Sequence, residues 1–437
     1  MKPESPLSGN TADEDVIYSS AYKRYVLVLL MLVYACNFLD RQILGVLLQA
    51  IKLDLGLSDT QMGFLSGMGF ALFYATLGIP LARWADNHKR VPLISVAIAV
   101  WSGMTALSGA AGNFFQLGLA RIGVGVGEAG CTPAAHSLIS DYFEPDARTR
   151  AMAIYAMGAP VGIFLGYLLG GWMNELYGWR VAFYSVGIPG LALALLVRFT
   201  IREPARGHSE PNAPISRESQ SVVEVVSYLW SQHSFRHLAL GTAFLALAAY
   251  GGATWFPAFL IRSHGMSTGE IGTWLGIISG VGGISGTLLG GYLGERLGNQ
   301  DKRWNAWIPA IALLASIPFT IGALTTDSRL WVLVLIIPSV IAPALHAAPV
   351  YATIQGLAGL HMRAMAVAVL FFITNMIGLG LGPLVMGVSS DLLSARFGDE
   401  SLRITLLLSL GFTLWGVVHY FIASKTIRAD LAHAQSV

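Results

Sequence analysis

The sequence has little charge for its length, and this scarcity narrows the class of protein. Asp, Glu, Lys and Arg make up 12% of the 437 residues, whereas soluble domains usually carry about 25%. The composition therefore argues against a cytosolic or secreted globular fold. The formal net charge of +2 is too small to indicate a nucleic-acid partner.

Cysteine pairs and a secretory leader are also missing. Cys36 and Cys131 both lie in apolar stretches without metal-ligand spacing, so we interpret them as packing residues and expect no disulfide framework. The first sixteen residues, MKPESPLSGNTADEDV, are polar and acidic. They have neither the basic start nor the apolar centre of a signal peptide, and we expect an uncleaved, flexible tail.

What the chain does contain is long apolar runs, with 54% hydrophobic residues and 49 glycines. A helix needs about 20 mostly apolar residues to cross a bilayer. These runs are longer than barrel strands and do not alternate polar with apolar residues. The sequence predicts twelve membrane spans: 24–49, 61–84, 91–112, 114–140, 151–174, 180–200, 236–262, 271–294, 304–325, 330–357, 363–390 and 402–424.

The placement of Lys and Arg predicts the direction of the spans. With both termini on the cytoplasmic side of the cell membrane, 19 basic residues fall inside and 6 outside, as the positive-inside rule requires. We expect a cytoplasmic tail (1–23), a first bundle (24–200), a cytoplasmic linker (201–235), a second bundle (236–424) and a cytoplasmic C-terminal tail (425–437). The linker is rich in Pro, Ser and charge, and a helix over about 222–232 is expected to lie along the membrane.

The two halves of the chain repeat each other. Asp86 and Glu295, in the loops after spans two and eight, are 209 residues apart, and the histidines of PAAH and PALH, His136 and His346, are 210 apart. Such offsets indicate a tandem duplication of a six-span unit. The predicted fold is an all-α membrane protein with twelve transmembrane helices in two parallel-repeat six-helix bundles around a central cavity, an architecture of transporters.

At this point the sequence resembles the major facilitator superfamily. That family carries a G-x-L-a-D-R-x-G-R-R signature between spans two and three and a weaker copy between spans eight and nine. The corresponding stretches here are ARWADNHKR, with Ala82 and Lys89 in place of glycines, and GYLGERLG. The resemblance implies a cytoplasmic gate, in which an acid sits at a neighbouring helix N-terminus; solvated loop charges are the alternative. The predicted gating residues are Asp86, Arg90, Asp141, Glu295 and Arg363.

A finer resemblance is to the spinster-type branch of this superfamily. It is carried by NFLDRQIL in span one, RIGVGVGEA in span four and MGAPVGIFLGYLLGG in span five. The resemblance implies an exporter of lysolipid or sphingolipid-like molecules. The glycine–proline runs 158–171 and 378–383 are interpreted as hinges where spans slide or bend.

Four charged residues lie away from the ends of the predicted spans, and an ionisable residue there is a functional candidate by default. Asp40 and Arg41 are in span one, and Arg121 and Glu128 share one face of span four. The resemblance implies proton coupling at Asp40 and Glu128, with Arg41 as the neighbour that tunes Asp40. A fixed ion-pair cluster that pins the two spans is the alternative.

Substrate contacts are predicted from polarity and apolar character. A guanidinium fork matches an anionic headgroup, so Arg121 binds either such a headgroup or one of the buried acids. For Asn37 and Asn375, hydrogen bonding between helices is the alternative role. The predicted substrate-binding residues are Arg121, Phe38, Asn37, Met157, Tyr250, Trp255 and Asn375.

The predicted function is proton-coupled secondary transport of an amphiphilic, lipid-like substrate by alternating access. The alternatives are an organic-anion or sugar-acid proton symporter, since FLDRQIL and LGLSDTQMG also resemble those carriers, and a polyspecific drug exporter. An enzyme is not expected, because no nucleophile–base or metal motif occurs at membrane depth. We expect no cofactor and no metal, with the proton gradient as driving force, and a monomer whose partners are the substrate and the bilayer.

Overall fold

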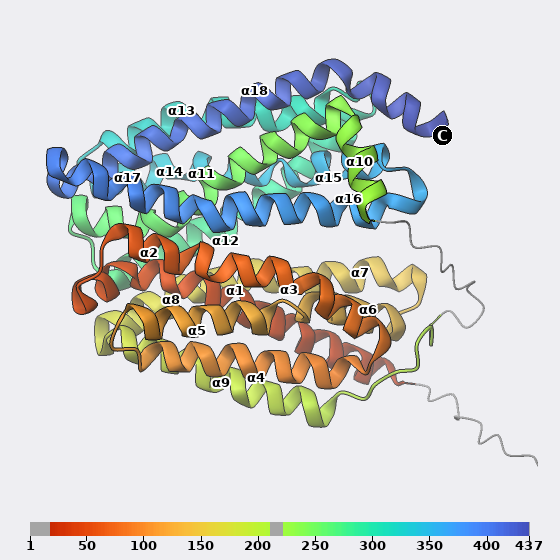
Figure 1. The fold of residues 1–437 in the computed structure, drawn as a ribbon, viewed down its shortest axis with the longest axis horizontal. Helices are drawn as coiled ribbons and strands as arrows, with labels where there is room; N and C mark the ends of the chain where they lie inside the picture. The colour runs from red at the N-terminus through yellow and green to blue at the C-terminus, as the bar shows by residue number, and fades with distance from the viewer. Residues whose placement is uncertain (1–17, 210–221, 437) are drawn as a thin grey trace, which may run out of the picture.

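The computed structural model describes residues 18–209 and 222–436, and this part of the chain is helical throughout (Figure 1). The expected N-terminal tail up to residue 17 and the linker segment 210–221 lie outside the described residues. In chain order the elements are α1 (Ser20–Leu55), α2 (Asp59–Ser66), α3 (Met68–Asn87), α4 (Arg90–Gly109), α5 (Phe114–Glu128), α6 (Cys131–Tyr142), α7 (Pro145–Ala156), α8 (Gly158–Tyr177), α9 (Trp179–Thr200), α10 (Val222–Ser231), α11 (His233–His264), α12 (Thr268–Gly298), α13 (Trp304–Thr325), α14 (Arg329–Ala344), α15 (Ala347–Leu357), α16 (Gly359–Thr374), the π-helix η1 (Asn375–Leu381), α17 (Gly382–Phe397), the 3₁₀ turn η2 (Gly398–Glu400) and α18 (Ser401–Ser436).

Nine helical stretches among the described residues are long and apolar enough to cross a membrane. The twelve expected spans map onto these and onto two interrupted helices. Span two is divided at Gly67 into α2 and α3, and span four is divided after Glu128 into α5 and α6. One apolar stretch, Met365–Ala434, contains the last two spans, which the turn at Gly398 (φ 55°) separates.

The helices form two halves that lie one above the other in Figure 1. Helices α1–α9 make the lower half and α10–α18 the upper half. The all-α membrane fold with two six-span bundles, predicted from the duplicated sequence, is thereby confirmed. Both described chain ends, at residues 18 and 436, lie at the same end of the molecule, which we name the terminal end; the opposite end is the distal end.

Packing joins the halves mainly at the distal end. One apolar core contains Ile43 and Trp179 of the first half together with Phe259 and Leu402 of the second. Towards the terminal end each half has its own core. The first half's core includes Trp101 and takes in one residue of η1, and the second half has a core of its own. The halves are therefore closed on each other distally.

Close helix packing makes this distal closure possible. Helices α8 and α12 cross where Gly171 faces Thr268 and Gly272, and a Cβ at Gly171 would collide with the Thr268 carbonyl oxygen. Polar contacts follow the same seam: Asn174 Nδ2 donates to Thr268 Oγ1 at 3.1 Å, and Gly269 N donates to a Glu175 carboxylate oxygen at 2.6 Å. Glycine at the crossing allows the two backbones to approach.

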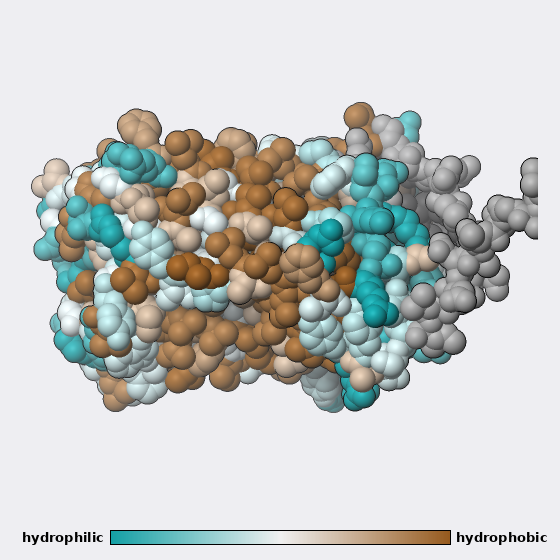
Figure 2. Space-filling model, turned by 90° about the horizontal axis from the view of Figure 1, so that it is seen from below, coloured by the Kyte–Doolittle hydropathy of each residue, from teal (hydrophilic) through white to brown (hydrophobic). Residues whose placement is uncertain are grey.

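The surface has the polarity of a membrane-spanning protein. Figure 2 shows a broad middle band of apolar side chains, with polar side chains gathered towards both ends. Ile188 and Leu195 of α9 are among the exposed apolar residues. A contiguous exposed apolar surface of this size is unfavourable in water and is matched by lipid.

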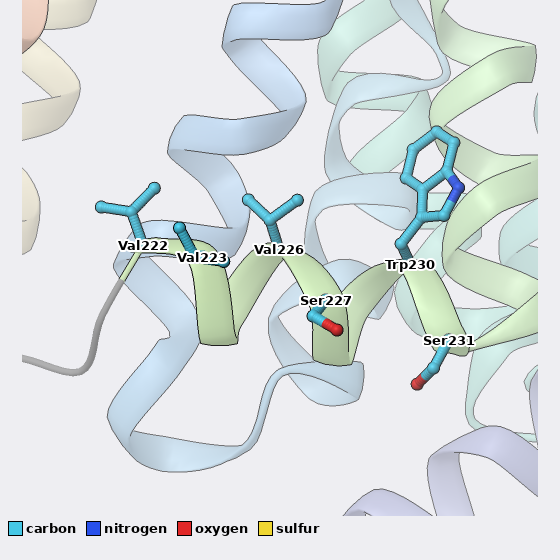
Figure 3. Close-up of a pocket in the computed structure, with 6 residues that line it drawn as sticks. All are labelled: Val222, Val223, Val226, Ser227, Trp230 and Ser231. Carbon is cyan, nitrogen blue, oxygen red and sulfur yellow. The ribbon is translucent and has the colours of Figure 1, made fainter.

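The expected helix at 222–232 is present as α10. It crosses the ends of the long helices at the terminal end (Figure 1), and it packs on α16 and α11. Figure 3 shows Val222, Val226 and Trp230 on one side of α10 and the serines Ser227 and Ser231 on another. The predicted helix is thus confirmed; its contact with a membrane surface stays a prediction.

Candidate functional site

Four charged side chains gather between α1 and α5, inside the apolar band. Asp40 of α1 and Arg121 and Glu128 of α5 are no more than 2% exposed, while the side chain of Arg41 is 19% exposed. Removing isolated charges from water is costly. The structure thus brings together the four ionisable residues that the sequence singled out, and it leaves Arg41 as the accessible member.

Arg41 is held by an acid and by aromatic faces. Its Nε donates to Glu128 Oε2 at 2.7 Å, and its Cζ lies 4.4 Å from the ring centroid of Tyr74, 5.0 Å from that of Phe70 and 5.4 Å from that of Phe38. Cation–π contacts contribute about 0.5–2 kcal/mol each, depending on solvation. The guanidinium can therefore exchange its carboxylate partner and still keep favourable contacts in the site.

Asp40 is not the partner of Arg41, although we expected Arg41 to tune it. Consecutive residues point about 100° apart on a helix, so Arg41 reaches Glu128 while Asp40 faces Trp101 and Thr105 of α4. The cation whose charge acts on Asp40 is Arg121. The sequence identified these residues, but their pairing depends on how α1 meets α4 and α5.

Part of the buried cluster has no hydrogen-bond partner. Among the residues that the structure describes, none donates to Asp40 Oδ1 or Glu128 Oε1, and none accepts from Arg121 Nε or Nη1. Leaving such groups unsatisfied in a low-dielectric interior is unfavourable. Binding of a proton, or an exchange of ion-pair partners, would therefore satisfy hydrogen-bonding atoms that have no partner in this conformation.

The predicted substrate-binding residues divide by accessibility. Met157 is 54% exposed and Tyr250 41% exposed, and Phe38 and Asn375 are half-buried. Asn375 begins the π-helix η1, so the hinge expected over 378–383 adjoins it. Contact of these four with a substrate stays a prediction.

The other three predicted contacts are buried. Trp255 is 0% exposed and donates from Nε1 to the Pro383 carbonyl oxygen at 2.9 Å, so it belongs to the distal packing between α11 and α17. Asn37 (3% exposed) and Arg121 (2% exposed) lie within the first half. In this conformation none of the three is accessible to a substrate.

The predicted gating residues of the first half anchor the linker. Arg90 is fully buried; it pairs with Asp141 and donates to Glu203 at 2.8 Å and to the Pro204 carbonyl oxygen at 3.0 Å. Gly207 N donates to Asp141 at 3.0 Å. These bonds fix the start of the linker on the first half.

The remaining gating candidates are less informative. The side chain of Asp86 lies outside the described part of the structure. Glu295 and Arg363 are exposed, and thus the copy of the motif in the second half differs from the buried Arg90–Asp141 pair of the first. A gating role for these three residues stays a prediction.

A second charged cluster, at the distal end, was missed by the sequence analysis. Arg262 of α11 grips Asp59 of α2 with two hydrogen bonds of 2.8 and 2.7 Å. Lys52 Nζ donates to the same carboxylate at 2.6 Å, and Ser390 Oγ of α17 donates to it at 2.7 Å. In return, Asp391 accepts from the N–H of Asp59 at 3.1 Å. We name these five residues the distal latch.

The latch joins the two halves through one buried acid. Asp59 is 2% exposed. Its burial would raise the pKa of the carboxyl, but hydrogen bonds from Arg262 and Lys52 outweigh burial and lower that pKa to about 2. The Ser58–Gln61 capping box signals a helix start in the sequence. Nothing local to that motif identifies Arg262, which is 203 residues away.

An internal cavity of about 280 Å³ lies mainly in the second half. Its wall combines apolar side chains such as Phe256, Leu275 and Leu410 with several hydroxyls, and Tyr167 of the first half lines it. The hydroxyl-bearing residues of the wall are Ser279, Ser316, Thr320, Ser339, Ser409 and Thr413. Ser and Thr inside membrane helices can satisfy their hydroxyls on backbone carbonyls, so the wall suits an apolar group.

Two duplicated helical halves, an apolar outer band and buried charge at mid-depth are the features of a membrane transporter. The model of the Major Facilitator Superfamily matches residues 30–383. The chain belongs to this superfamily, in its spinster-type branch.

Three relatives support this placement. The chain is 36% identical over 407 residues to an "MFS-type efflux pump" of Mycolicibacterium smegmatis, with 92% of each protein covered. It is 30% identical over 322 residues to "Protein spinster homolog 1" of Xenopus laevis, covering 68% of this chain and 60% of that one. A crystal structure of a bacterial homolog of the human lysosomal transporter spinster, inward-facing and unoccupied, superposes with a TM-score of 0.88 at 34% identity, covering 94% of this chain and 99% of that one.

Proposed function

We propose that this transporter moves an amphiphilic, lipid-like molecule, such as a lysophospholipid or a sphingolipid-like compound, in exchange for or together with protons. The observation that carries the proposal is the ion pair between partly exposed Arg41 and buried Glu128, near which Asp40 and Arg121 are also buried. A buried ion pair whose cation borders an accessible space is suited to exchange of partners.

The proposed cycle starts with a proton on Glu128. Protonation removes the negative charge that holds the Arg41 guanidinium, which is then free to pair with an anionic substrate group or with Asp40. Substrate and proton thereby act on the same cation. Because each binds one arrangement of the cluster better than the other, each shifts the equilibrium between the two orientations of the halves.

The distal latch supplies the other half of the proposed cycle. In this conformation Arg262 and Asp59 hold the distal end closed, so a substrate would enter or leave at the terminal end. Opening the distal end requires the latch to break. Alternating access follows if rearrangement of the Arg41 cluster loosens the packing of α1, which carries both Arg41 and the latch residue Lys52.

The nature of the second-half cavity supports a lipid-like substrate. An apolar wall of this kind receives an acyl chain, whereas a sugar acid needs many convergent polar groups. Efflux of drug-like amphiphiles is a second candidate, favoured by the full-length relative described as an efflux pump. Competition between a lysolipid and a cationic drug for export from liposomes separates these two candidates.

Replacing Glu128 with Gln tests proton coupling. In liposomes with an imposed pH gradient, Glu128→Gln should reduce lysolipid transport to the level of protein-free vesicles, while substrate binding in detergent persists. Glu144→Gln, the same change at an exposed acid, should transport like the wild type. If Glu128→Gln lowers the melting temperature but keeps gradient-driven transport, the four charges form a fixed structural cluster and the proposal fails.

We further propose that the protein resides in the cell membrane with both termini in the cytoplasm. The supporting observation is the excess of Lys and Arg at the terminal end. A reporter enzyme active only in the cytoplasm, fused after residue 437, should be active in cells. The same reporter inserted at Asp327, a distal residue whose side chain is 94% exposed, should be inactive, and the reverse pattern would invert the topology.

A further inference from the structure

A cluster of basic side chains lies between α11 and α18 near the terminal end, outside the site described above. His233, Arg236 and His237 come from the first turns of α11, and His419 comes from α18. The two helices run side by side (Figure 1). We name these four residues the histidine groove.

The three imidazoles are packed against one another. The Nδ1 atoms of His237 and His419 are 2.7 Å apart and share a hydrogen bond. The ring centroids of His233 and His237 are separated by 4.5 Å, and those of His237 and His419 by 4.9 Å. All three rings are half-buried. A hydrogen bond between two neutral histidines leaves the Nε2 atoms available to another partner.

The groove also has an unused donor. Arg236 is permanently charged, and its Nε is buried without a hydrogen-bond partner among the described residues. The carboxylate of Asp430 accepts from the Ser234 backbone N–H at 2.8 Å. The groove therefore combines one guanidinium and three protonatable rings, an arrangement that favours an anion.

Next to these basic residues, on the side away from the terminal end, the side chains of α11 and α18 are aromatic. The ring of Phe244 stacks on His419 with a centroid distance of 5.8 Å, and Trp415 meets His419 edge-on at 6.1 Å. Trp415 is 57% exposed, and Val418 beside it is 48% exposed. His237 lies one turn, about 6 Å, inside the start of α11. The basic part thus lies nearer the terminal end of the two helices than the aromatic part does.

We propose that the histidine groove binds an anionic phospholipid of the surrounding bilayer. The phosphodiester would lie against Arg236 and the histidines, and an acyl chain would run along Phe244 and Trp415. Basic pockets between membrane helices at the interface have the charge and depth to hold such headgroups. The site is separate from the Arg41 cluster, so the bound lipid is a component of the membrane and is distinct from the transported substrate.

Thermal unfolding of purified protein in detergent supplies the first test. Added phosphatidylglycerol should raise the melting temperature of the wild type more than added phosphatidylcholine does. Arg236→Gln should remove most of this difference, with about fivefold weaker phosphatidylglycerol binding for each charge removed. Arg296→Gln, which removes an exposed interfacial cation on α12, is the matched control and should behave like the wild type.

The outcomes separate a lipid site from a mere helix contact. If His237→Gln and Arg236→Gln lower the melting temperature equally in both lipids, the groove only joins α11 to α18 and the proposal is overturned. An equal loss in Arg296→Gln would show that general surface charge attracts the lipid, and this also overturns it.

Quenching of Trp415 gives an independent readout. Phosphatidylglycerol brominated on its acyl chain should quench the part of the fluorescence that is absent in Trp415→Phe, and Arg236→Gln should weaken this quenching. Equal quenching by brominated phosphatidylcholine would show that the groove contacts any acyl chain, without headgroup selection, and would contradict the proposal.

Discussion

Arg41 has the contacts that the proposed coupling of protons to substrate requires of one side chain. It is the one member of the four-charge cluster described here that combines an ion pair with partial exposure and three aromatic contacts. Its exposure would let an anionic group reach it, and the aromatic rings would stabilise it if Glu128 released it. Because Glu128 is buried, bulk water cannot readily replace Arg41 as the partner of its carboxylate.

At this scale the sequence predicted which charges lie together inside the first half but not how they pair. A charge inside an apolar run is recognisable because its burial is expensive. Whether Arg41 meets Asp40 or Glu128 depends on the orientation of α5 relative to α1, which no local pattern contains. The Asp59–Arg262 bond was missed for a related reason: Asp59 precedes its predicted span and Arg262 ends its own, and charges at span ends are ordinarily solvated.

Replacing Asp59 with Asn should destabilise the protein by about 3 kcal/mol, because Arg262 and Lys52 lose a buried charged partner. The pKa of Asp59 is lowered to about 2, below the usual value of about 3.9. Its contribution is therefore complete above about pH 4 and is lost as the pH falls through about 2. The difference in melting temperature between wild type and Asp59→Asn should stay constant from pH 5 to pH 8.

Asp54→Asn is the control for this prediction, since Asp54 and Arg180 form an exposed pair at the same end; it should shift the melting temperature little. A difference that shrinks towards pH 5 would mean that the latch itself titrates in the working range. In that case protons would act at the distal end as well as at Glu128.

Among the helices, glycines decide where two elements can approach. The run 158–171 was predicted as a hinge, and the structure uses its last glycine for the crossing of α8 and α12. The run 378–383 overlaps η1, where a π-helical turn precedes Pro383, a residue without an N–H donor. The sequence thus located the irregular region at 378–383, whereas 158–171 lies within the regular helix α8, and hinge motion at either run stays a prediction. The sequence could not predict the breaks at Gly67 and after Glu128, which depend on neighbouring helices.

Replacing Gly171 with Val should weaken distal closure, because a Cβ there collides with the Thr268 carbonyl oxygen. Overpacking of this kind costs about 1–3 kcal/mol, roughly a 5- to 150-fold change in the ratio of closed to open states. Spin labels at Leu176 and Asp327, on opposite halves of the distal end, should then report longer distances. Gly411→Val is the control, because a Cβ there meets open space, and it should leave the distance distribution unchanged. If Gly171→Val also leaves the distances unchanged, the seam between α8 and α12 does not control closure.

The whole molecule has one closed end and two separate terminal cores, so the proposed alternating-access cycle requires the distal seam to part. The duplication in the sequence predicted two similar, parallel halves, because a unit of six spans begins and ends on the same side of the membrane. Duplication cannot tell which end is closed. That choice depends on the balance between the distal latch and contacts that form in the opposite orientation.

A reversible cross-link across the seam tests this requirement directly. Asn174 and Thr268 are hydrogen-bonded across the halves at 3.1 Å, so Asn174→Cys with Thr268→Cys, in a background lacking Cys36 and Cys131, should form a disulfide on oxidation. The oxidised protein should stop transporting while still binding substrate from the terminal side, and a reductant should restore transport.

The matched control places an equivalent bond inside one half. Asn305 and Thr353 are hydrogen-bonded at 2.9 Å within the second half, and their double cysteine variant should transport when oxidised, because rocking leaves each half intact. If the seam cross-link forms in full and transport continues at the uncross-linked rate, the halves do not need to separate distally. Transport would then follow a path within one half and would not depend on rigid-body motion of the two halves. The cavity lined by Phe256 is the candidate for such a path.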